Sequence, residues 1–196
     1  MNLALFDFDG TITFKDTFSG FIHDAVDFKR KVLGSIVLSP YIIGYSLNLV
    51  SDGVIRTQLC HFGFKGKDEV DIQAAGLRYS RHYLHQVIRE KALDKIKWHQ
   101  AQGDHVVVVS SSLSVYLADW CAQMGVDLIC NDLESRDGIL TGWLVDGDCG
   151  GEEKARRIRD RYTLHQYSTI YAYGDTANDD AMLALADKKY FKWQEV

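Results

Sequence analysis

The chain has 196 residues, of which 46% are hydrophobic and 25% are charged, and its formal net charge is −5. This length is enough for one domain with a sizeable core plus an inserted subdomain. The acidic balance argues against a general nucleic-acid binder, because a phosphate backbone attracts a basic surface. A single proline leaves little room for a proline-rich linker or a disordered tail.

The predicted elements begin with a short apolar run, Leu3 to Asp9 (LALFDFD), which ends in acids and Gly10. It is typical of a buried parallel strand and the loop at its carboxyl end. Residues 17–86 have few strand signals and are expected to be helical. Residues 87–102 place apolar positions among charges, which predicts an amphipathic helix that Gly103 terminates.

Residues 104–110 (DHVVVVS) form a second β-branched run, which stops at three serines. A helix is predicted over 114–124 and a third short strand over 126–130. Residues 139–145 follow Asp137-Gly138 and are expected to form one arm of a β-hairpin, since Asp-Gly favours tight turns.

A charged helix is predicted over 152–162, a fourth core strand over 169–173 and a last helix over 178–186. This alternation of strands and helices predicts an α/β fold with a doubly wound, Rossmann-like parallel sheet. One long helical insert interrupts it after the first strand. We therefore expect a core domain formed by residues 1–13 and 87–196, and a helical cap formed by residues 14–86.

The segment Val32 to Val50 carries no charge over about the length that a membrane helix needs. Pro40, two glycines and several polar residues weaken it as a spanning helix. We expect a pair of buried cap helices that break near Pro40. The alternative is a surface that contacts a membrane peripherally or binds a lipid-like substrate.

The cysteines and histidines form no recognisable metal motif. None of the four cysteines lies in a C-x-x-C pair, and the chain does not begin with the pattern of a signal peptide. We therefore expect reduced thiols and a cytoplasmic location, with membrane association as the alternative. The histidines are scattered and are expected on the surface or in the cap: His23, His61, His82, His85, His99, His105 and His165.

Carboxylates occur where predicted strands end. Asp7 and Asp9 close the first strand, and Asp175 follows the fourth. Because ligands of open parallel sheets bind at the carboxyl ends of the strands, these acids are expected to converge. Their charges would repel one another unless a cation or a proton intervenes. A hard divalent ion such as Mg²⁺ would relieve that repulsion.

A phosphate site is predicted beside the acids. Ser110 ends the second strand with a helix just beyond it, so its hydroxyl and the free backbone amides there form an anion site. Lys154, near the start of another helix, adds a positive charge. Metal, hydroxyl, amides and ammonium together describe a site for a bound phosphoryl group.

These residues form four short motifs. Residues 7–11 (DFDGT) resemble the first motif of the haloacid dehalogenase superfamily of phosphohydrolases. Ser110, which follows four valines, resembles the second motif, and Lys154 in GEEK resembles the third. Residues 174–179 (GDTAND) resemble the fourth. The resemblance spans nearly the whole chain. The insert is similar to the helical cap of the branch that contains the phosphoserine phosphatases.

The resemblance implies a role for each matching residue. Asp7 would be the nucleophile that forms an aspartyl-phosphate. Asp9 would protonate the leaving alcohol and then activate water. Ser110, with Ser111 beside it, would hold phosphoryl oxygens, and Lys154 would neutralise charge on the transferring group.

The resemblance also implies a Mg²⁺ ion held by Asp7, Asp175 and the backbone carbonyl of Asp9. Asn178 and Asp179 would lie behind these ligands. Asp179 would act through metal-bound water or by orienting Lys154.

The substrate is less defined. Asp16 lies where phosphoserine phosphatases carry a glutamate that reads an amino group, and Arg56 lies in the region of their cap arginine. The second motif continues Ser111-Ser112 where theirs continues with glycines.

The expected function is a Mg²⁺-dependent phosphatase of a small phosphorylated metabolite. A phospholipid phosphatase of the phosphatidylglycerophosphatase type, a phosphoserine phosphatase and a non-catalytic phosphate-binding protein remain alternatives. The sequence leaves open whether the phosphoryl group passes to water or to another acceptor, and what the oligomeric state is.

Overall fold

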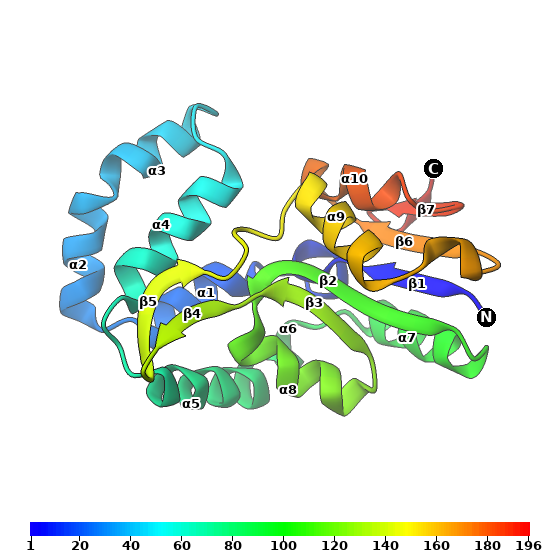
Figure 1. The fold of residues 1–196 in the computed structure, drawn as a ribbon, viewed down its shortest axis with the longest axis horizontal. Helices are drawn as coiled ribbons and strands as arrows, with labels where there is room; N and C mark the ends of the chain where they lie inside the picture. Colours follow the sequence, from blue (N-terminus) through cyan, green and yellow to red (C-terminus); the bar gives the residue numbers. More distant parts are fainter.

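The computed structural model describes residues 1–196, and its centre is a six-stranded sheet between two layers of helices (Figure 1). Every pair of neighbouring strands is parallel except the last, where the chain turns back on itself. In spatial order the strands are β3 (Asp127–Asn131), β2 (His105–Leu113), β1 (Leu3–Phe6), β6 (Ile170–Gly174), β7 (Lys188–Phe191) and β8 (Gln194–Glu195).

Helices cover both faces of the sheet because successive side chains of a strand point to opposite faces. Leu3 and Leu5 of β1 pack in one apolar cluster with side chains of α9 (Glu152–Arg161) and α10 (Asp180–Leu183). Ala4 and Phe6 pack in the other with α7 (Glu90–Ala101) and α8 (Ser114–Met124). The predicted doubly wound α/β fold is therefore confirmed.

The segment between β1 and α7 is helical, as predicted, and lies beyond the carboxyl ends of the strands (Figure 1). It contains α1 (Thr17–Ala25), α2 (Phe28–Val37), α3 (Ser39–Ser46), α4 (Asp52–Phe64), α5 (Glu69–Tyr79), a wide turn at Ser80–Leu84 and α6 (His85–Val87). We call this segment the cap. The hairpin of β4 (Leu133–Arg136) and β5 (Ile139–Leu144) extends from the core against α4, with both turn residues, Asp137 and Gly138, at positive φ.

The two chain segments that join cap and core are paired with each other. Thr13 forms an antiparallel bridge with Ile88, the Phe14 amide donates to the Val87 carbonyl at 2.9 Å, and the Arg89 amide donates to the Ile12 carbonyl at 2.8 Å. This pairing keeps residues 88–89 extended, so the helix predicted from residue 87 begins only at Glu90. The division at residues 14 and 86 stays a prediction.

Two further predictions of local structure were wrong. The second strand does not stop at Ser110 but continues to Leu113, because Leu113 still pairs with Asn131 of β3 beyond a register shift. The last helix is shorter than predicted: one 3₁₀ turn at Ala177–Asp179 leads into a helix that ends at Leu183.

One histidine lies in the core rather than on the surface or in the cap. His99 is fully buried on α7 and bonds Asp104 Oδ2 through Nδ1 at 2.8 Å and the Tyr173 hydroxyl through Nε2 at 2.9 Å.

The segment Val32 to Val50 breaks near Pro40 as predicted, since α2 ends at Val37 and α3 begins at Ser39. The expectation that these helices are buried was wrong. α3 contains no buried residue, and α2 buries only Gly34. None of the helices has both the length and the apolar character required to cross a bilayer.

Candidate active site

The loop after β1 carries Asp7 and then makes a single wide turn over Phe8–Ile12. Within this turn Gly10 has φ +86°, a conformation that side chains disfavour. A Cβ atom at Gly10 would lie 2.2 Å from Asp175 Oδ2. The glycine therefore lets the loop after β1 and the loop after β6 approach closely enough to bring Asp7 and Asp175 together.

Lys154 lies at the centre of a buried ion-pair network. Its side chain is 2% exposed, and its ammonium donates to Asp7 Oδ1 at 2.5 Å and to Asp179 Oδ1 at 2.6 Å. Burial opposes the charge of Lys154, but the two carboxylates more than offset it, so the pKa of Lys154 is raised. Burial raises the pKa of Asp7 to about 8, with Lys154 opposing the rise and Asp179 adding to it.

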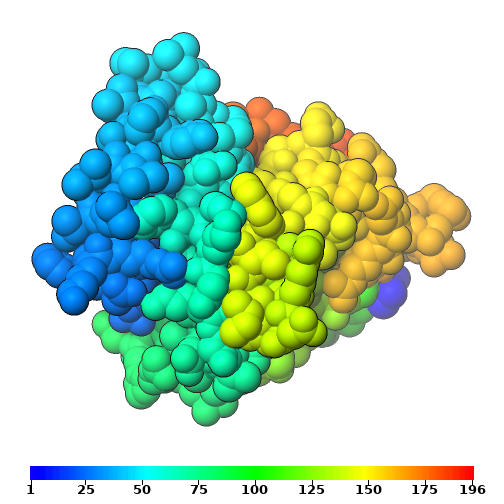
Figure 2. Space-filling model, turned by 60° about the vertical axis from the view of Figure 1, so that its left-hand side comes forward, coloured from blue at the N-terminus to red at the C-terminus, as the bar shows by residue number.

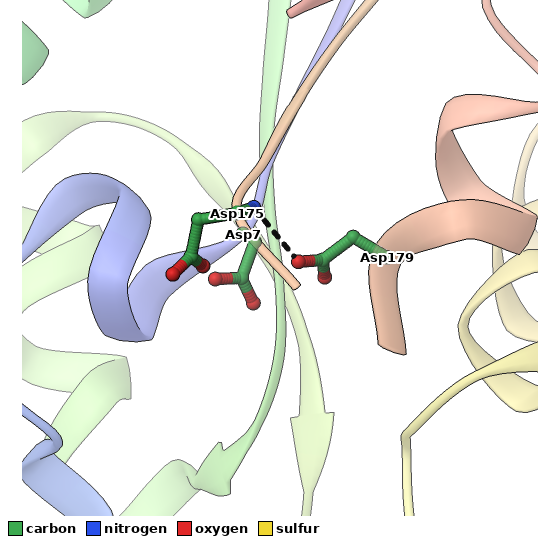
Figure 3. A group of neighbouring side chains, drawn as sticks. All are labelled: Asp7, Asp175 and Asp179. Carbon is green, nitrogen blue, oxygen red and sulfur yellow. Dashed lines mark hydrogen bonds between the residues drawn. The ribbon is translucent and has the colours of Figure 1, made fainter. Parts of the chain in front are cut away.

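Asp7, Asp175 and Asp179 form a carboxylate cluster in which one oxygen of each lies within 4.8 Å of the others. Asp7 and Asp175 extend side by side into the same space, whereas Asp179 approaches from the opposite side (Figure 3). Asp179 Oδ2 accepts from the backbone amides of Asp175 and Thr176, both at 3.1 Å, and its Oδ1 accepts from Lys154.

The donor set of this cluster fits a hard divalent cation. Carboxylate oxygens are preferred ligands of Mg²⁺, and a cation between Asp7 and Asp175 would offset the repulsion and burial that raise their pKa values. Because both oxygens of Asp179 already accept hydrogen bonds, Asp7 and Asp175 have the oxygens best placed to bind the ion directly.

Asp9 is fixed by hydrogen bonds from two elements. Its Oδ1 accepts from the Thr17 amide and hydroxyl, both at 2.6 Å, and its Oδ2 accepts from the Ser112 hydroxyl at 2.5 Å. Burial raises the pKa of Asp9, and the hydrogen bonds from Ser112 and Thr17 oppose that rise. Asp9 and Asp7 are two residues apart, but their different partners allow different protonation states at one pH.

The three serines of β2 have different contacts. Ser110 is buried, and its Oγ accepts from the Ser112 amide at 3.0 Å. The Ser111 hydroxyl donates to the Cys149 carbonyl at 2.6 Å, in the loop before α9. Ser111 therefore braces the loop that leads to Lys154, and its contact with phosphate stays a prediction.

Arg56 reaches from α4 in the cap to the core. It makes a two-pronged ion pair with Asp148, with Nε–Oδ1 and Nη2–Oδ2 distances of 2.9 Å. Asn131 Nδ2 also donates to Asp148 Oδ1 at 3.0 Å and fixes that carboxylate in place. The guanidinium predicted to read a substrate carboxylate is thus bound to a carboxylate of the protein itself.

Asp16 makes its contact within the cap, whereas Asn178 connects cap and core. Asp16 is exposed and caps α1 by accepting from the Ser19 amide at 3.2 Å. Asn178 Nδ2 donates to Asp52 Oδ2 at 2.6 Å, and so joins the loop after β6 to the start of α4.

A cavity of about 570 Å³ lies between cap and core. Nine of the residues that the sequence predicted for the site line it: Asp7, Asp9, Asp16, Arg56, Ser110, Ser111, Lys154, Asn178 and Asp179. Asp175, the tenth, borders it through the carboxylate cluster. A second cavity of about 810 Å³ shares Tyr45, Asp52 and Asn178 with the first and extends between the loop at residues 48–51 and the loop that precedes α9.

The sequence reasoning missed the residues that hold these groups in place. Thr11 donates to Asp175 Oδ1 at 3.2 Å and lies within the DFDGT motif, so the motif could have indicated it. Thr17 and Ser112, the partners of Asp9, lie beside residues that were considered. Asp148 and Asn131 carry no local signal, since they contact Arg56 and Ser111 only through the fold.

Comparisons with known proteins agree with this geometry. A model of the haloacid dehalogenase-like hydrolase family matches residues 4–184. Protein CicA of Caulobacter vibrioides is 29% identical over 97% of this chain and 85% of its own length. A Bordetella pertussis Tohama I structure of unknown function has a TM-score of 0.79 at 22% identity, covering 97% of this chain and 89% of that one.

A phosphoserine phosphatase solved as an analogue of its phospho-aspartyl intermediate has a TM-score of 0.68 at 20% identity. It covers 97% of this chain and 85% of that one. At these identities the solved structures establish the fold, while the family match extends over most of the chain. The chain belongs to the haloacid dehalogenase-like hydrolases.

Proposed function

We propose that this hydrolase is a Mg²⁺-dependent phosphatase that cleaves a small phosphomonoester through an aspartyl-phosphate on Asp7. The observation that carries the proposal is the buried contact of Lys154 with both Asp7 and Asp179, beside Asp175, at the cavity between cap and core. A nucleophile, a buried ammonium and two further carboxylates in one place are the groups that phosphoryl transfer requires.

Asp7 attacks phosphorus with one carboxylate oxygen, the P–O bond to the alcohol breaks, and the enzyme carries the phosphoryl group as an acyl phosphate. Lys154 contacts Asp7 Oδ1 and places positive charge where negative charge develops on the transferring group. Asp179 holds Lys154 in that position through its own contact of 2.6 Å.

Asp9 supplies the proton that the leaving alkoxide needs. Burial raises the pKa of Asp9, which favours the protonated form that a proton donor needs. The same group, once deprotonated, removes a proton from the water that hydrolyses the aspartyl-phosphate. Thr17 and Ser112 orient the carboxyl group through both steps.

Asp7 and Asp175, with the backbone carbonyl of Asp9, would hold Mg²⁺. When bound, the ion would neutralise phosphate charge and orient the phosphoryl group for in-line attack. Ser110, buried at the cavity wall, would donate its hydroxyl to a phosphoryl oxygen.

The contact between Arg56 and Asp148 bears on the substrate. A guanidinium already paired with a carboxylate gains little from a substrate carboxylate, which argues for a small phosphomonoester other than phosphoserine. Asp16 and Asp52 remain on the cap side of the cavity and disfavour a negatively charged leaving group.

The test is hydrolysis of an aryl phosphate by the wild type and by Asp7→Asn, with Mg²⁺ and with a chelator. We expect hydrolysis by the wild type that the chelator abolishes, and none by Asp7→Asn. The matched control is Asp180→Asn, which removes an exposed carboxylate one position after Asp179 and should keep full activity. Equal hydrolysis by wild type and Asp7→Asn would exclude the nucleophile. Binding of phosphate without hydrolysis of any phosphomonoester would favour a binding protein.

A phospholipid phosphate is the second candidate substrate. Ile42 and Tyr45 line the inner cavity and Leu49 lines the outer one, although each is also strongly exposed. An apolar wall that continues from the cavity to the surface would suit a substrate with an acyl chain. Comparing hydrolysis of a short-chain lipid phosphate with that of glycerol phosphate tests this, because only a lipid-specific enzyme would prefer the first.

A further inference from the structure

α2 exposes its apolar side chains to solvent and turns basic side chains inward, which is unusual for a surface helix. A helix on a protein surface normally turns its apolar stripe inward and its charged face to solvent. In α2 the inward positions carry Arg30, Lys31 and Gly34, which lie against α1 and α4 or the space between them. The outward positions are apolar and exposed: Phe28, Val32, Leu33, Ile36 and Val37.

The exposed apolar surface continues over α3 and the loop after it. Tyr41, Ile43 and Leu47 are exposed, and Leu49 reaches 80% exposure. We call residues 28–49 the apolar face. This segment forms the outer edge of the molecule, away from the core, in the space-filling view (Figure 2). A contiguous apolar surface of this kind on a protein in water marks a binding site for another surface.

The charged residues within the apolar face have one sign, although Asp27 and Asp52 flank it in the sequence. Residues 28–50 include Lys29, Arg30 and Lys31 and no acidic residue, although the whole chain has a net charge of −5. Arg30 donates to the carbonyls of Gly63 and Lys65, and Lys31 donates to that of His23. Carbonyl partners carry no net charge, and the adjacent acid, Asp27, is already paired with Lys67 at 3.1 Å.

We propose that the apolar face docks on an anionic lipid membrane. A helix with apolar side chains on one face and basic side chains on the other lies in the interface of such a membrane. α2 and α3 have 10 and 8 residues and are separated at Leu38, so they would lie along the surface. A second copy of the chain fits less well, because a twofold contact would bring each basic cluster near its own copy.

The apolar face shares residues with the walls of both cavities. Ile42 and Tyr45 of α3 line the inner cavity, and Leu49 and Val50 line the outer one. Docking would therefore hold this part of the cavity walls near the membrane interface. The docking itself does not require the proposed phosphatase activity.

The test is flotation of the protein with vesicles of equal parts phosphatidylcholine and phosphatidylglycerol, and with vesicles of phosphatidylcholine alone. We expect binding to the anionic vesicles that weakens in high salt and is much lower on neutral ones. Ile36→Glu replaces a side chain that is 66% exposed on the apolar face and should weaken partitioning by about tenfold or more.

The matched control is Val70→Glu, which also replaces a β-branched apolar side chain with a carboxylate, at a position 68% exposed on α5 and outside the apolar face. It should lower binding far less. Thermal melting confirms that each variant is folded, so the test does not rely on catalysis. Absence of vesicle binding, or equal loss in both variants, would overturn the proposal. The proposal would also be overturned if the protein formed a dimer that Ile36→Glu dissociates and did not bind vesicles.

Discussion

Asp179 offers a sharp test of the buried network, because each of its carboxylate oxygens has different partners. Oδ1 accepts from the Lys154 ammonium at 2.6 Å. Oδ2 accepts from the amides of Asp175 and Thr176 and from the Thr176 hydroxyl at 3.1–3.3 Å. Asp179→Asn keeps the shape of the side chain but replaces one oxygen with an NH₂ group, which can only donate.

The expected loss of folding free energy depends on which of the two orientations of the amide introduced by Asp179→Asn breaks fewer hydrogen bonds. If the NH₂ group faces Thr176, three hydrogen bonds are lost, so we expect it to face Lys154, where one charged hydrogen bond is lost. Asp179 is 1% exposed, and water cannot replace the missing partner. Loss of a buried charged hydrogen bond, with two donors left facing each other, costs about 2–4 kcal/mol. For a chain of this size, about 3 kcal/mol lowers Tm by roughly 6–12 °C.

Thermal melting of Asp179→Asn beside Asp180→Asn measures this effect. Asp180 is the next residue and is exposed, so its variant should stay within about 0.5 kcal/mol of the wild type. Hydrolysis by Asp179→Asn should also fall, because Lys154 loses one of the two carboxylates that position it against Asp7. Equal melting temperatures for the two variants would show that Asp179 does not hold Lys154 in the way described.

Three further changes test other parts of the structure. Gly76→Ala would place a Cβ 2.1 Å from the Val115 carbonyl oxygen, so α5 and α8 would have to move apart. The free energy of unfolding, measured by urea denaturation, should fall by roughly 1–3 kcal/mol, and an unchanged midpoint would contradict this contact. Burial lowers the pKa of His99, so the unfolded state binds more protons and stability should fall as the pH drops below about 6.5. In His99→Gln, the denaturation midpoint should depend less on pH across this range. The same pH dependence in the variant and the wild type would show that other groups cause the effect. Asp148→Asn should release Arg56 and lower KM for phosphoserine relative to an aryl phosphate, and an unchanged ratio would show that Arg56 does not face the substrate.

The sequence predicted the convergence of the site residues because parallel topology is a strong constraint. Asp7 follows β1 and Asp175 follows β6, and β1 and β6 are neighbours in the sheet. Two acids at the carboxyl ends of adjacent parallel strands must lie close together, whatever the loops do. The position of Lys154 was less constrained, and its burial between two carboxylates follows from the loop before α9, which Ser111 braces.

Predictions that depended on distant partners were weaker. The serines after Val109 are poor strand formers, so the end of β2 was placed at Ser110, but pairing of Leu113 with Asn131 extends the strand. Arg56 and Asp148 are 92 residues apart, and no local pattern links them. Whether residues 32–50 are buried depends on what covers them, and an apolar pattern by itself does not contain that information.

The charges of the residues that line the cavity affect how a phosphate could bind there. Asp16 and Asp52 face it from the cap, whereas the charge of Arg56 is already matched by Asp148. Lys154 is likewise matched by Asp7 and Asp179, so the protein offers a doubly charged phosphate no free cation. A phosphate monoester would enter this cavity against net repulsion unless a metal ion came with it or was already bound. In the proposed reaction Mg²⁺ is therefore needed for substrate binding as well as for chemistry. Lowering the concentration of free Mg²⁺ should raise KM together with lowering kcat, whereas an ion required only for chemistry would lower kcat alone.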